Sequence, residues 1–168
     1  GFQRLMQRRV REILLVSSPY DSFVLAEDGK LHEMILSEFL DHNLSYAPGI
    51  TRVSSGEEAL ALARAQHRFN LIITTMHIDD MPVIEFAHRL RAEGLATPLI
   101  LLTYDNRELA SLLQRQDTNA FDRIFNWQGD FRIFLTIVKH IEDLMNGVHD
   151  NRAVGVQVII LVEDSIRY

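Results

Sequence analysis

Short apolar runs recur along this 168-residue chain, and each is followed by a stretch with the spacing of a helix. The runs are rich in Ile, Leu and Val, which is typical of strands that are buried on both faces. Strands that alternate with helices form parallel sheets with right-handed crossovers. The pattern therefore predicts an α/β fold, a doubly wound (βα)5 domain with a five-stranded parallel sheet. The predicted strands are residues 13–16, 50–53, 71–75, 99–103 and 121–125.

The stretches between these runs predict the helices. Apolar residues recur there at three and four positions, and turn or capping residues stand at the ends. We expect a short polar helix over residues 2–11 and a long loop over residues 20–29, which show no clear period. The remaining helices are expected over residues 31–42, 59–67, 83–92, 106–114 and 131–144.

The end of the chain repeats its beginning. Residues 13–18 read Ile-Leu-Leu-Val-Ser-Ser, and residues 159–164 read Ile-Ile-Leu-Val-Glu-Asp. A repeat at so large a distance indicates a second domain rather than a solenoid. We therefore predict a helical N-terminal linker, a main domain, a second linker and the first strand of a truncated second domain. These parts are residues 1–11, 12–147, 148–157 and 158–168.

Composition narrows the chemistry and the partners. The chain has no cysteine, which excludes disulfides and cysteine nucleophiles. Its formal net charge of -6 argues against a nucleic-acid partner, because phosphate binding needs clustered Lys and Arg. No apolar run approaches the ~18 residues of a membrane span. We expect a cytoplasmic protein with no nucleic-acid or membrane partner.

Hydroxyl or amide side chains follow four of the predicted strands. Ser17 and Ser18 follow the first, Thr75 ends the third, Thr103 ends the fourth and Asn126 follows the fifth. The carboxyl ends of parallel strands meet at one edge of a doubly wound sheet, where its binding crevice lies. We therefore expect these side chains to share one crevice, which they line without charge.

Four segments of the chain resemble response-regulator receiver domains, over about residues 12–146. They are residues 13–16, the segment 55–60 that reads Ser-Gly-Glu-Glu-Ala-Leu, and residues 71–86 and 98–103. The tail, residues 160–164, resembles the first strand of a further, unaltered receiver. The resemblance implies a receiver fold within a multidomain, bacterial two-component or phosphorelay protein.

Working receivers hold Mg²⁺ with two acids after the first strand and accept a phosphoryl group on an Asp after the third. A hydroxyl and a Lys after the fourth and fifth strands bind the phosphoryl oxygens. The resemblance puts Ser17 and Ser18 at the acidic-pair positions and Thr75 at the acceptor position. Thr103 matches the hydroxyl position. Asn126 falls near the Lys position, and the chain has no Lys between Lys30 and Lys139.

These substitutions remove the chemistry of phosphoryl transfer. Mg²⁺ prefers carboxylate oxygens, and two serines carry no charge. Thr75 offers an alcohol with no evident base beside it, where the family uses a carboxylate. We therefore predict a pseudo-receiver that is not phosphorylated, is not an enzyme, binds no metal or cofactor and works through protein contacts. The predicted partners are the neighbouring receiver domain of the same chain and a second copy in a homodimer.

Several readings stay open at this point. The hydroxyl cluster is either a hydrogen-bonded plug or a small-anion site in a ligand-binding flavodoxin-like domain, and the whole chain is alternatively the regulatory front end of a phosphoenolpyruvate-utilising enzyme. His77, with Asp79 and Asp80, is either a replacement site or part of a solvated turn.

Two apolar groups also have two readings each. Phe125, Trp127 and Phe131 are either interface anchors or a cover over the core edge. The apolar residues of the predicted loop either cover the crevice or contact a neighbouring domain: Tyr20, Phe23, Val24 and Leu25.

Overall fold

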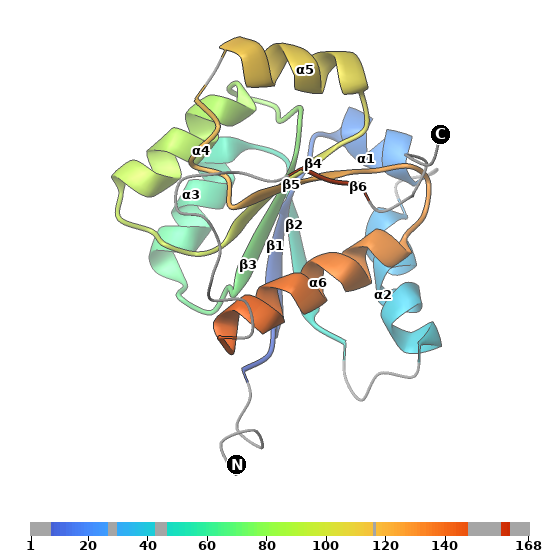
Figure 1. The fold of residues 1–168 in the computed structure, drawn as a ribbon. Coiled ribbons are helices and arrows are strands. Elements are labelled where there is room, and N and C mark those ends of the chain that lie inside the picture. Colours follow the sequence, from blue (N-terminus) through green and yellow to red (C-terminus); the bar gives the residue numbers. More distant parts are fainter. Residues whose placement is uncertain (1–7, 27–29, 43–46, 116, 148–158, 162–168) are drawn as a thin grey trace.

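The computed structural model describes residues 8–26, 30–42, 47–115 and 117–147, together with the backbone of residues 159–161 (Figure 1). Its centre is a sheet of six parallel strands in the order β2-β1-β3-β4-β5-β6. The chain runs from β1 outward to β2 and then returns to the other side of β1, so that the crevice of a doubly wound sheet lies at the β1–β3 boundary. The strands are β1 Glu12–Val16, β2 Gly49–Val53, β3 Leu71–Thr75, β4 Leu99–Thr103, β5 Arg123–Asn126 and β6 Ile159–Leu161.

Helices cover both faces of this sheet (Figure 1). Helices α2 and α6 contact each other, and so do α3 and α4. The predicted five-stranded α/β arrangement is confirmed, with β6 added beside β5. The helices are α1 Pro19–Leu25, α2 Leu31–Asp41, α3 Gly56–Ala65, α4 Val83–Ala92, α5 Asn106–Arg115 and α6 Arg132–Met145.

Successive residues of each inner strand pack alternately into two separate hydrophobic cores. Ile13 and Leu15 of β1 pack in the core under α2 and α6, whereas Leu14 and Val16 pack in the core under α3 and α4. Neighbouring side chains on a strand point to opposite faces, so a strand covered on both faces must be apolar throughout. This requirement explains the continuous apolar runs and fixes the carboxyl ends of β1, β3 and β4 at one edge.

The predicted loop over residues 20–29 is wrong in its first part, which forms helix α1. Ser18 caps this helix by accepting a hydrogen bond from the Asp21 backbone N–H at 3.0 Å, and Pro19 occupies its first turn. The helix has only seven residues, too few for a helical period to stand out. Residues 27–29 lie outside the described part.

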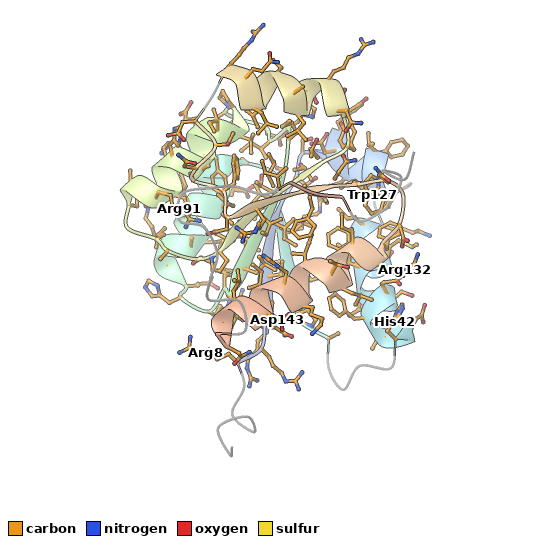
Figure 2. The ribbon with its side chains drawn as sticks, viewed as in Figure 1. Arg8, His42, Arg91, Trp127, Arg132 and Asp143 are labelled. Atoms are coloured by element: carbon orange, nitrogen blue, oxygen red, sulfur yellow. The ribbon has the colours of Figure 1, made fainter. Side chains whose placement is uncertain are left out.

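The predicted helix over residues 2–11 is also absent from its described part, residues 8–11. Val10 is buried, and its backbone N–H donates to Glu142 Oε2 at 2.9 Å. The backbone N–H of Arg8 donates to Asn146 Oδ1 at 2.8 Å. Figure 2 shows Arg8 at the carboxyl end of α6. Side chains of α6 thus bind this segment, whereas residues 1–7 lie outside the described part.

The strand predicted in the tail is confirmed for residues 159–161, which extend the sheet at β5. Ile160 lies opposite Phe125 in a parallel register. The assignment of this strand to a second domain stays a prediction, and the predicted linker over residues 148–157 lies outside the described residues. Among the described residues, no helix has the length and hydropathy that crossing a bilayer requires.

Truncation after Gly147 tests the pairing of β6 with β5. We expect the shortened chain to keep its fold, because the core residues that the structure describes all lie before position 148. The amides of Arg123–Asn126 should exchange with deuterium faster, because their strand becomes the edge of the sheet. The amides of β2, which is an edge strand in both chains, serve as the control. Unchanged exchange in β5 would show that the tail does not pair there.

Candidate functional site

The carboxyl edge of the sheet collects the predicted polar residues. Ser17, Thr75 and Thr103 are fully buried, and Asn126 is almost so. Thr103 and Asn126 lie opposite each other in the β4–β5 register. The Oγ1 of Thr103 and the Oδ1 of Asn126 have no hydrogen-bond partner among the described residues. The sheet therefore brings the predicted residues to one edge, as expected from the strand order.

The hydroxyls on β1 and β3 bond to nearby protein atoms. Ser17 Oγ donates to the Ser18 carbonyl at 3.2 Å, and Ser22 Oγ lies 3.0 Å from Ser17 Oγ. Thr75 Oγ1 donates to the carbonyl of His77 at 3.2 Å. Since a hydroxyl has a single proton to donate, none remains on Ser17 or Thr75 for a ligand. This arrangement fits the interpretation of the cluster as a hydrogen-bonded plug.

A buried carboxylate that sequence reasoning missed lies beside this plug. The Asp21 side chain, on α1, is fully buried. It accepts three hydrogen bonds: from the His77 backbone N–H at 2.8 Å, from His77 Nδ1 at 2.9 Å and from the Tyr104 hydroxyl at 2.6 Å. Burial of a carboxylate is costly unless donors of this kind surround it. Asp21 was missed because it lies in the segment that was predicted to be a loop.

His77 connects this carboxylate to a second one. Its Nε2 lies 2.7 Å from Glu108 Oε2 on α5, while its Nδ1 faces Asp21. Both ring nitrogens donate only in the charged form of histidine. Burial lowers the pKa of His77, but the hydrogen bonds that its ring makes to Asp21 and Glu108 outweigh burial and raise that pKa above its usual value. The contacts of both ring nitrogens with carboxylates thus favour the imidazolium form of His77.

Tyr104 completes the group, which we call the Asp21 cluster (Asp21, His77, Tyr104 and Glu108). Burial, together with the hydrogen bond to Asp21, raises the pKa of Tyr104 well above its usual value. The phenol thus stays protonated and donates to Asp21. The cluster joins α1, the loop after β3, the loop after β4 and α5 across the carboxyl edge of the sheet.

One acid of the loop after β3, Asp80, has a structural role. The two carboxylate oxygens of Asp80 accept from the backbone N–H groups of Gly56 at 2.7 Å and Glu57 at 3.0 Å. Asp80 therefore caps the first turn of α3, where a negative charge is favourable. Among the described residues, no three His, Asp or Glu side chains are arranged to hold a metal ion.

The predicted aromatic interface is largely buried. Phe125 is fully buried and Trp127 is 9% exposed, so neither is available as an exposed anchor. Trp127 packs edge-on against Phe131 with ring centroids 4.8 Å apart. Figure 2 shows Trp127 near the amino end of α6. The alternative reading, in which these aromatics cover the core edge, fits the structure because all three belong to or pack against the α2–α6 core.

At the level of sequence, no family model and no curated protein matches this chain. Solved structures do match in fold. The signal receiver domain of an HD domain-containing protein from Pseudomonas fluorescens Pf-5 is 19% identical, with a TM-score of 0.60 over 86% of this chain and 96% of that one.

Two further structures agree with this match. The response regulator TrrA from Thermotoga maritima, solved in complex with Mg²⁺ and BeF, is 20% identical, with a TM-score of 0.57 over 78% of this chain and 98% of that one. The chemotaxis response regulator CheY4 of Vibrio cholerae is 19% identical, with a TM-score of 0.55 over 79% and 98%. The chain therefore has the fold of signal-transduction receiver domains.

The Asp21 cluster predicts a pH-dependent stability. Because the pKa of His77 is raised in the folded chain, His77 stabilises the fold fully below its unfolded value of about 6.5. This contribution is lost as the pH rises through the raised folded value. Urea unfolding should therefore show a loss of stability for His77→Gln at low pH that shrinks at high pH.

The matched control for this experiment is His67→Gln, since His67 is exposed in the turn after α3. Its effect on the free energy of unfolding should not depend on the Asp21 cluster. An NMR titration of the His77 ring provides the direct measurement. A midpoint at or below 6.5 would contradict the arrangement described for the cluster.

Proposed function

We propose that this chain is a pseudo-receiver, a receiver fold that is not phosphorylated and acts as a protein-interaction module in a multidomain signalling protein. The observation that carries the proposal is the burial and hydrogen bonding of Thr75, at the end of β3. Its side chain is fully buried and its hydroxyl donates to the His77 carbonyl. A phosphoryl acceptor must instead be exposed to the donor and able to attack it.

The attack would also need a base near Thr75, and the histidine that could serve as one is already engaged in other hydrogen bonds. His77 is the titratable group nearest to Thr75 in the chain, and both of its ring nitrogens face carboxylates. An imidazolium in this position has no free lone pair with which to take the Thr75 proton. Ser18, at one of the acidic-pair positions, uses its side chain to cap α1.

Charge argues against the alternative of an anion site among the same hydroxyls. The Asp21 carboxylate lies within the Asp21 cluster beside the plug, and one cationic side chain, His77, is shared there between two carboxylates. The cluster itself is therefore net negative, which disfavours a dianionic phosphate beside it, and Arg52, near Ser17, already donates to Ser22 Oγ at 3.1 Å. The place of this domain at the front of a phosphoenolpyruvate-utilising enzyme stays a prediction.

Incubation with acetyl phosphate and Mg²⁺ tests the loss of phosphoryl transfer. We expect no increase in intact mass for the wild-type chain. Thr75→Asp should also stay unmodified and should lose about 3 kcal/mol of stability, because it buries a carboxylate against the His77 carbonyl. Thr75→Val, which removes only the hydroxyl, should lose about 1 kcal/mol. A phosphorylated wild-type chain, or beryllofluoride and Mg²⁺ bound beside Thr75, would overturn the proposal.

Helix α1 offers the apolar surface that the proposed contacts need. Tyr20 is 66% exposed, Phe23 is 56% exposed and Val24 is 38% exposed. Their spacing of three and four residues puts them on one side of the helix. Exposed aromatics of this kind are the usual anchors of protein interfaces. We propose this surface as the contact with a second copy of the chain.

Sedimentation velocity measures this contact. We expect the wild-type chain to self-associate, and Phe23→Asp to return it to a monomer because a charge replaces the central anchor. Leu113→Asp is the matched control, since Leu113 is also exposed but lies on α5. Self-association that survives in Phe23→Asp, or a wild-type chain that stays monomeric at high concentration, would count against α1 as the homodimer surface.

A further inference from the structure

A hollow of about 340 Å³ lies between the start of α4 and one side of α5. Its apolar wall comes from Met76, Val83, Ile84 and Leu112. Its polar wall comes from both ends of α5 and includes Glu108, Ser111 and Arg115, and His77 lies where the hollow meets the Asp21 cluster. The hollow is open to solvent, and its volume lies at the lower end of the range for small-molecule sites, which combine an apolar lining with a few polar groups that orient the ligand.

One side of α5 is built to face this hollow. Residues 111 and 112 each lie three or four positions from both 108 and 115, so the four residues lie on one side of the helix. Leu109 is the one buried residue of this helix. Helix α5 therefore contributes little to the core. Its polar side chains line the hollow opposite the apolar residues at the start of α4.

The charged residues of the hollow differ in whether they are paired. His77 and Glu108 form an ion pair at 2.7 Å, with Asp21 behind them. Arg115 forms no ion pair with any described residue, and Ser111 lies one turn before it on the same helix. A guanidinium binds a carboxylate through two parallel hydrogen bonds, and a hydroxyl one turn away can add a third. Glu108, on the same wall, would repel an anion of higher charge.

We propose that this hollow binds an apolar monocarboxylate. The carboxylate pairs with Arg115 and Ser111, and the hydrocarbon part packs on Ile84, Val83 and Leu112. This inference does not depend on the proposed function, because the hollow lies outside the plug of Ser17 and Thr75. A ligand there would also contact His77 and Glu108, whose hydrogen bond attaches α5 to the loop after β3.

Octanoate is the probe, added to the isotope-labelled full chain and followed by two-dimensional NMR. We expect saturable shifts at the amides of α5 and the first turn of α4. Octylammonium, which has the same chain length and the opposite charge, should produce no saturable shift there. Shifts that do not saturate, that map elsewhere, or that are equal for the two probes would overturn the proposal.

Two pairs of variants separate the head group from the chain. Arg115→Gln should weaken octanoate binding about tenfold or more, which is the loss of one charged pair. Arg107→Gln is its matched control, since Arg107 is exposed on α5 and does not line the hollow, and it should bind as the wild type does. Ile84→Ala should weaken octanoate, whereas Leu113→Ala, on the exposed side of α5, should not. An Arg115→Gln chain that binds octanoate normally would refute the assigned head-group contact.

Discussion

The buried carboxylate of Asp21 is the interaction on which the carboxyl edge of this sheet depends. It has no exposure to solvent and takes donors from the His77 backbone, the His77 ring and the Tyr104 hydroxyl. A buried carboxylate without such donors would cost several kcal/mol, so its presence fixes the positions of all three. Since these donors lie on loops after two different strands, Asp21 links both loops to α1.

The neutral residues at this edge have a physical consequence. In the receiver family, several carboxylates share this edge with a metal ion. Here Ser17 and Thr75 are neutral, and Asp21, the one buried acid among the described residues, comes from a helix and lies against the His77 ring. The donors around Asp21 offset the cost of burying its charge, and they tie α1 to the loops after β3 and β4. An edge held in this way supports the proposal that the domain acts through protein contacts.

The inner strands β1, β3 and β4 were predictable because a parallel strand covered on both faces must be apolar throughout, and their short runs end at turn or capping residues. Other features depend on contacts that no local pattern encodes. Helix α1 has seven residues, so only Ser18 and Pro19 marked its start. Asp21 looked like an ordinary loop acid because its partner His77 is far away in sequence. Trp127 looked like an interface residue, yet Phe131 and Phe134 cover it.

The segment before β1 has a mechanical consequence. The backbone N–H of Arg8 donates to the Asn146 side chain, the Asn146 side chain donates to the Arg8 carbonyl, and the backbone N–H of Val10 donates to Glu142. The chain that enters the sheet is therefore clamped to the far end of α6 before its first strand begins. A pull or a twist applied at Arg8 would therefore be shared between β1, to which the backbone leads directly, and the carboxyl end of α6. The first strand and the last described helix thus both resist displacement of this segment.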